Sequence, residues 1–223
     1  MNLTNLVIIP ARGGSKRLPG KNLKVLGEIP LIQHSINYAL AAGLLIDTIV
    51  VSTDSDAIAA VAKNCGVKVV KRPAQLSGDH EPVISAMQHV IDSLSDSYEN
   101  VILLQPTNPL RPENLLKESL ESFESSKVDS LMTVDFLKEK FGKIMGDKFV
   151  PENYIMGQRS QDLPQLYREN GLLYITKVGE ILKGNILAEN NFAMVVDHPY
   201  SRVDIDDSTD FKFAQLLLET HAS

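Results

Sequence analysis

Basic residues gather in one glycine-rich loop near the start of the chain. The segment from Pro10 to Asn22 reads PARGGSKRLPGKN, and all five charged residues before Glu28 are Lys or Arg. Glycines let backbone N–H groups turn toward an anion. Lys and Arg side chains then neutralise the anion, Arg in a bidentate manner. Because clustered cations repel one another without an anion, the loop predicts a triphosphate site, with a solvated loop as the alternative.

Two familiar phosphate-binding patterns do not fit this loop. A Walker A motif needs glycine, four residues, and then Gly-Lys-Ser/Thr. Here Ser15 stands where the first glycine belongs, and Asn22 stands where Ser or Thr belongs. The dinucleotide-binding pattern Gly-x-Gly-x-x-Gly is also absent from the loop. The loop therefore predicts phosphate binding outside these two classes.

A pair of aspartates near the other end of the chain could hold a metal ion. Residues 203–206 read VDID, and we predict a strand there. Residues i and i+2 of a strand share a face, so Asp204 and Asp206 would project together with Cβ atoms about 6–7 Å apart. Such carboxylates suit Mg²⁺, which takes oxygen ligands and completes its shell with water and phosphate. Asp207 and Asp210 are expected to cap the final helix and to place negative charge in its first turn, where it interacts favourably with the helix dipole.

The elements that must position these residues alternate between strand and helix. Apolar and β-branched runs predict strands at 6–9, 48–52, 67–70, 101–104, 130–134, 172–176, 194–196 and 203–206. Helical spacing predicts helices at 31–45, 54–66, 82–94, 112–125 and 208–220. Residues 1–223 therefore form a single α/β domain with a mainly parallel central sheet and helices on both faces, a Rossmann-like architecture.

One stretch, at about 135–170, interrupts this alternation. It is more polar and has no strong periodicity. We interpret it as an excursion from the sheet that serves as a lid, a dimerisation arm or a flexible loop. Ligands of open parallel sheets bind beyond the carboxyl ends of the strands. The loops after Ile9, Val70 and Leu104 are therefore the places to look for chemistry.

Composition narrows the function classes. The formal net charge of −6 argues against a general nucleic-acid binder, whereas one basic loop in an acidic chain favours a small anionic ligand. No apolar run approaches the roughly 18 residues that span a bilayer, and residues 1–4 do not resemble a signal peptide. We expect a cytoplasmic protein without a membrane partner. The single cysteine, Cys65, excludes an internal disulfide and is expected to be structural.

Six segments, in order and at their spacing, resemble the acylneuraminate cytidylyltransferases over nearly the whole chain. They are Ile9–Arg17 followed by Lys21-Asn22, Val51–Ser55, Arg72–Leu76 followed by Asp79, Leu104–Arg111, Leu163–Gly171 and Asp204–Asp206. The resemblance implies a nucleotidyltransferase fold and a Mg²⁺-dependent reaction. In that reaction the anomeric hydroxyl of a sialic-acid-type nine-carbon acidic sugar attacks the α-phosphorus of CTP and releases pyrophosphate.

The same resemblance implies roles for individual residues. The nucleotide-binding residues are Arg12, Gly13, Ser15, Lys16, Lys21, Asn22 and Arg72. The acceptor-binding residues are Gln105, Arg159 and Lys140, with Lys138 as an alternative to Lys140. The metal ligands are Asp204 and Asp206, and the catalytic residues are Arg12, Lys21, Gln105 and Asp206.

The resemblance also implies a homodimer, because in this family the excursion is a dimerisation arm that reaches the neighbouring active site. Several alternatives stay open. The acceptor could be legionaminate, pseudaminate or Kdo, or the chain could make a different NDP-sugar on the same fold. A non-catalytic nucleotide-sensing or assembly module is the alternative from another class.

Overall fold

The structure is a computed structural model that describes residues 4–78 and 81–221. Residues 1–3 and Asp79, which belong to the sequence features described above, lie outside this part. Within it, seven strands form the main sheet in the order β11-β7-β10-β6-β1-β4-β5. Their bounds are β1 Asn5–Pro10, β4 Thr48–Thr53, β5 Lys68–Lys71, β6 Asn100–Leu103, β7 Ser130–Leu137, β10 Leu166–Lys177 and β11 Asn191–Val195.

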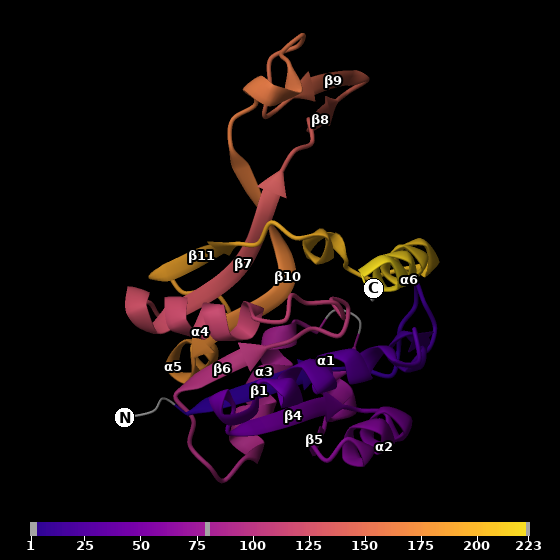
Figure 1. Ribbon diagram of the computed structural model, residues 1–223, viewed down its shortest axis with the longest axis vertical. Helices are drawn as coiled ribbons and strands as arrows, with labels where there is room; N and C mark the ends of the chain where they lie inside the picture. Colours follow the sequence, from indigo (N-terminus) through magenta and orange to yellow (C-terminus); the bar gives the residue numbers. More distant parts are fainter. Residues whose placement is uncertain (1–3, 79–80, 222–223) are drawn as a thin grey trace.

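The sheet is mainly parallel, as predicted. β1 pairs in parallel with β4 and β6, β4 with β5, and β7 with β11. β10 is the exception, because it runs antiparallel to both β6 and β7. This antiparallel strand closes the excursion, which leaves the sheet after β7 and returns along β10 (Figure 1).

Helices cover both faces of the sheet because side chains alternate along each strand. Val7 and Ile9 of β1 pack against α1 Leu31–Ala41, α2 Asp56–Asn64 and α4 Leu115–Ser126. Leu6 and Ile8 point the other way, toward α3 Val83–Ser93 and α5 Val178–Leu182. All four β1 side chains are fully buried. The predicted two-faced α/β architecture is therefore confirmed, although the predicted helix 31–45 ends at Ala41 and continues as a 3₁₀ turn at Gly43–Leu45.

A third apolar cluster joins the two ends of the chain. It contains Leu18 and Leu26 from the start, Val203 and Ile205 from the end, and Ala214 of the last helix, α6 Ser208–His221. The short strands β2 Val25–Leu26 and β3 Ile29–Pro30 form a hairpin beside α6. This cluster fixes the C-terminal segment against the basic loop.

The predicted strand at 203–206 is wrong. The segment is irregular and lies between the 3₁₀ helix Pro199–Arg202 and α6. Its backbone bonds to a loop instead of a strand ladder, since the N–H of Ile205 donates to the carbonyl of Thr107 at 2.8 Å. The predicted burial is nevertheless present, because Val203 and Ile205 are buried while Asp204 and Asp206 are not. The two aspartates do not share one face as predicted, because they line different pockets.

The excursion is an arm that projects from the sheet (Figure 1). Its tip carries a hairpin of β8 Gly142–Met145 and β9 Lys148–Pro151. Large apolar side chains on the arm are exposed, among them Ile144 at 70%, Met145 at 64% and Ile155 at 79%. None of the helices in the described ranges combines the length and hydrophobicity needed to cross a membrane.

Candidate active site

The basic loop is tied to the carboxyl end of β4. The N–H of Gly13 donates to Asp54 Oδ1 at 2.8 Å, and a Cβ at Gly13 would lie 3.0 Å from Ser55 Cβ. The side-chain amide of Asn22 donates to the carbonyl of Arg12 at 2.9 Å. Gly13 is therefore needed for close backbone approach, and its N–H is directed at Asp54 in this structure. These anchors fix the backbone from which the cationic side chains extend.

The first and last parts of the chain meet at Lys21 and Asp206. Lys21 is buried, and its Nζ donates to the carbonyl of Ile205 at 2.6 Å. The same Nζ lies 3.4 Å from Asp206 Oδ1, and Arg17 Nη2 lies 2.8 Å from Asp206 Oδ2. Both carboxylate oxygens of Asp206 therefore face cations of the loop. Sequence reasoning assigned no role to Arg17, although its place beside Lys16 in the loop was a usable signal.

Asp204 is the second carboxylate of the pair. It is open to solvent at the rim of a pocket, yet surrounding protein atoms desolvate it and raise its pKa above the usual value. The charge of Asp206 raises the pKa further, whereas a hydrogen bond from Thr107 opposes the rise. A carboxylate whose negative charge is disfavoured in this way gains from a nearby cation.

The donor set fits Mg²⁺, because both side chains supply hard oxygen ligands. Across the described ranges, no group of three or more His, Cys, Asp or Glu side chains is arranged to hold a metal ion. Asp204 and Asp206 are the side chains that would contribute ligands from the protein. Water and substrate phosphate would complete the shell, as is usual for Mg²⁺ in nucleotide sites.

A first pocket, here the loop pocket, opens between the basic loop and β5, with a volume of about 260 Å³. It is lined by Pro10, Arg12, Ser15, Lys21, Asn22, Arg72, Gly78, Glu81, Pro82, Val83, Gln105, Pro106, Thr107 and Asp206. An adjoining cavity of about 290 Å³ adds Lys16 and Arg17. The predicted nucleotide-binding side chains thus surround one connected, cationic region.

Arg72 is held rigidly at the end of β5. Its Nη2 donates to the carbonyl of Ser52 at 2.8 Å, and its Nε donates to Ser52 Oγ at 3.1 Å. Burial lowers the pKa of Arg72, and the charge of Asp54 counteracts this. Two of its five N–H donors are engaged by Ser52 of β4, which fixes Arg72 as part of the wall of the loop pocket.

A second pocket, here the β10 pocket, has a volume of about 420 Å³. It is lined by Gln105, Asn108, Arg168, Glu169, Asn170, Gly171, Tyr174, Ser201, Arg202 and Asp204. Gln105 lines both pockets, and Asp204 and Asp206 lie one on each side. The aspartate pair and Gln105 therefore mark the boundary between the two pockets.

Buried polar side chains fix this boundary. Asn108 donates to the carbonyls of Asn170 at 2.9 Å and Val203 at 2.8 Å. Arg111 is 6% exposed and donates to the carbonyl of Gln105 at 2.9 Å. Burial lowers the pKa of Arg111 to about 10. Asn108 thus supports the aspartate segment, and Arg111 supports Gln105.

The predicted acceptor residues of the arm lie elsewhere in this chain. Arg159 forms a bidentate ion pair with Asp162 at 2.7 and 3.0 Å. Lys140 donates to the carbonyl of Gln158 and lies 5.1 Å from the centre of the Tyr154 ring. Neither side chain lines the loop pocket or the β10 pocket. Within one chain, the structure brings Gln105 to the boundary but not these two residues.

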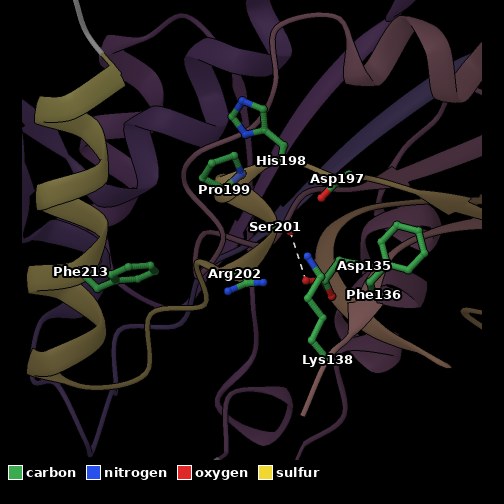
Figure 2. Close-up of a pocket in the computed structure, with 9 residues that line it drawn as sticks. All are labelled: Asp135, Phe136, Lys138, Asp197, His198, Pro199, Ser201, Arg202 and Phe213. Carbon is green, nitrogen blue, oxygen red and sulfur yellow. Dashed lines mark hydrogen bonds between the residues drawn. The ribbon is translucent and has the colours of Figure 1, made fainter. Parts of the chain in front are cut away.

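Figure 2 shows a third pocket, next to the β10 pocket, with a volume of about 280 Å³. It contains Lys138 and shares Ser201 and Arg202 with the β10 pocket. Asp135, buried between the two, accepts a hydrogen bond from Ser201 Oγ at 3.2 Å and a bidentate pair from Arg168 at 2.9 and 3.1 Å. Arg168 and Arg202 were not singled out from the sequence, although Arg168 lies in the segment that carried the resemblance.

Comparison with known proteins identifies the family. The cytidylyltransferase family model matches residues 6–221. A pseudaminic acid cytidylyltransferase of Campylobacter jejuni is 32% identical over 98% of both chains. A CMP-N,N'-diacetyllegionaminic acid synthase of Legionella pneumophila is 31% identical over 96% of both. An N-acylneuraminate cytidylyltransferase of Streptococcus agalactiae is 32% identical over 92% of this chain, which spans 51% of that relative's length.

Solved structures agree on the fold. A CMP:2-keto-3-deoxy-manno-octonic acid synthetase complexed with CTP matches with a TM-score of 0.71 and 18% identity, covering 97% of this chain and 99% of its own. A 4-diphosphocytidyl-2C-methyl-D-erythritol synthase matches with a TM-score of 0.70 and 13% identity, covering 98% and 99%. Together with the family model and the relatives, this confirms the resemblance drawn from the sequence: the chain belongs to the cytidylyltransferase family.

Proposed function

We propose that this chain transfers CMP from CTP to the anomeric hydroxyl of a sialic-acid-type nonulosonic acid and releases pyrophosphate. The observation that carries the proposal is the contact of Lys21 with Asp206 at the boundary of two pockets that share Gln105. One pocket is cationic and suits a triphosphate, and the other has the mixed polarity that a polyhydroxylated acid needs. The relatives named for this chemistry support the same reaction.

On the nucleotide side, Arg12, Ser15, Lys16 and Lys21 hold the phosphates. Asn22 and Arg72 also line the loop pocket and contact the nucleoside. The α-phosphorus then lies at the boundary, where the acceptor hydroxyl can attack in line. The chain's own contribution is to orient the two substrates and to stabilise the developing charge.

On the acceptor side, Gln105 contacts the sugar near the attacking hydroxyl. Asp204 and Asp206 would hold Mg²⁺, which when bound would polarise the α-phosphate and lower the pKa of the attacking hydroxyl. The leaving pyrophosphate is released beside the cations of the same loop, among them Arg12 and Lys16. The cytoplasm is the proposed compartment.

The acceptor itself has a second candidate class. Relatives that this chain matches over 96% or more of both lengths are named for pseudaminic acid and for diacetyllegionaminic acid. Pseudaminate and legionaminate are therefore tested beside N-acetylneuraminate, with Kdo as the eight-carbon comparison.

A turnover panel tests the reaction. Pyrophosphate release is expected only when CTP, Mg²⁺ and a nonulosonic acid are all present, because the proposed reaction needs both substrates and the metal ion at the boundary of the two pockets. The rate is measured with CTP, UTP and ATP against each of the four acceptors. Equal rates with UTP or ATP would disprove the cytosine assignment, and release without any acidic sugar would disprove the acceptor class.

We further propose a homodimer in which the arm reaches the neighbouring subunit. Exposed apolar residues on the arm need a partner surface, and Arg159 and Lys140 would then supply the cations for the acceptor's carboxylate. Ile144→Glu with Met145→Glu is expected to give monomers in analytical ultracentrifugation and to weaken acceptor binding. Leu44→Glu is the matched control, since Leu44 is fully exposed on the sheet domain. A monomeric unmodified chain with full turnover would contradict the proposal.

A further inference from the structure

A bulge in β10 brings Glu169 beside Tyr174. β10 pairs with β7 at Glu169↔Val134 and resumes at Tyr174↔Met132, so residues 170–173 face the single residue Thr133. Gly171, within the bulge, has φ +71, and a Cβ there would lie 2.7 Å from Asn108 Oδ1. The hydroxyl of Tyr174 donates to Glu169 Oε1 across the bulge.

This pair presents a fixed acceptor to the β10 pocket. Tyr174 is 5% exposed, whereas Glu169 is exposed on the pocket wall. Burial and the nearby Glu169 raise the pKa of Tyr174, so its phenol stays protonated and keeps donating. A carboxylate has about four acceptor positions, and one bond from Tyr174 leaves room for a ligand donor.

The charges around the pocket decide what that ligand group must be. Glu169 and Asp204 make one part of the lining acidic, while Arg168 and Arg202 supply cations. Arg168 is already paired with Asp135. An acyl oxygen or a second carboxylate facing Glu169 would be repelled. An amide N–H or a hydroxyl would form a charge-assisted hydrogen bond.

We propose that Glu169 is a specificity-determining residue that accepts a hydrogen bond from an N–H or O–H group of the acceptor sugar. This inference rests on the proposed function. If Glu169 accepts this bond, the sugar bound in the β10 pocket carries an acylamino or hydroxyl group at the position that faces Glu169. A sugar with an anionic substituent at that position would bind less well.

Glu169→Ala and Glu169→Gln test the contact. Alanine is expected to raise the acceptor KM tenfold or more, and glutamine, a neutral acceptor, by less. The Kd of CTP, measured by calorimetry, should stay within twofold of the unmodified chain. Glu124→Gln is the matched control, because Glu124 is exposed on α4 and lines none of the three pockets described above.

A cycle with acceptor analogues identifies the donor. In each analogue one hydroxyl or acylamino group is replaced by hydrogen. At the sugar position that faces Glu169, deleting the group should raise the acceptor KM of the unmodified chain tenfold and should change the KM of Glu169→Ala little. If the non-additive position is a hydroxyl, the donor is an O–H group; if it is an acylamino group, the donor is an N–H group. Either result supports the inference.

Two results would overturn it, and they differ. Unchanged acceptor KM in Glu169→Ala, or additive losses at every position, would reject the Glu169 contact while leaving the cytidylyl transfer intact. An unmodified chain that binds CTP but turns over no nonulosonic acid would reject the proposed function and this inference together.

Discussion

Asp206→Asn is expected to lower turnover by about a thousandfold while the fold stays intact. Asp206 lies at the boundary of the two pockets, and its carboxylate faces both Lys21 and Arg17. Asparagine keeps the shape but loses the negative charge that a divalent cation requires. Its side chain is partly exposed, and the buried Lys21, which loses the opposite charge of Asp206, keeps its bond to the Ile205 carbonyl.

Two measurements separate loss of the metal site from loss of structure. Calorimetry should show that Mg²⁺ tightens CTP binding to the unmodified chain and has little effect on Asp206→Asn. Asp207→Asn is the control, because Asp207 accepts from the N–H groups of Thr209 and Asp210 at the start of α6, a capping role that asparagine also fills. A turnover rate near normal in Asp206→Asn would contradict the proposal that Asp206 is a metal ligand.

The architecture was predictable because its signals are local. The fully apolar run at 6–9 is a strand buried on both faces, and β-branched residues mark β4. The glycine and proline content of residues 10–22 indicates a loop at the carboxyl end of that strand, where parallel sheets bind ligands. These features depend on neighbours in sequence, so no tertiary contact was needed to recognise them.

The prediction at 203–206 shows where local signals stop. Alternation correctly predicted which side chains are buried, because Val203 and Ile205 must join an apolar cluster. It could not show whether a partner strand was available. The Thr107 carbonyl and the Asn108 side chain take the hydrogen bonds that a ladder would have formed, and both come from a loop about 95 residues earlier in the chain.

The missed site residues depend on distant contacts in the same way. Arg168 and Tyr174 flank the bulge of β10 and both line the β10 pocket. Asn170-Gly171 indicates a turn locally, but it does not show that the residues on its two sides line one pocket. Arg111 supports Gln105 from six residues away, yet its buried position also requires Ser35 of α1 and Leu172 of β10. Such clusters follow from topology and are recognisable only after folding.

Lys21→Ala is expected to lower kcat by roughly a hundredfold to a thousandfold, the range for removing one preorganised charge donor. Lys21 has two tasks. Its ammonium lines the loop pocket, where we propose that the phosphates bind, and its bond to the Ile205 carbonyl holds the segment that carries Asp204 and Asp206. Stopped-flow pyrophosphate release measures kcat at saturating CTP, and calorimetry measures the effect of Mg²⁺ on CTP binding.

The control for this change is Lys24→Ala. Lys24 belongs to the same basic run but is exposed and lines neither the loop pocket nor its adjoining cavity. Lys21→Arg separates the two tasks: it keeps the charge, but a guanidinium is too wide for a buried position 2.6 Å from the Ile205 carbonyl. We expect Lys21→Arg to stay well below normal kcat. Normal kcat in Lys21→Arg would mean that charge alone suffices, whereas normal kcat in Lys21→Ala would mean that the triphosphate is held away from this boundary.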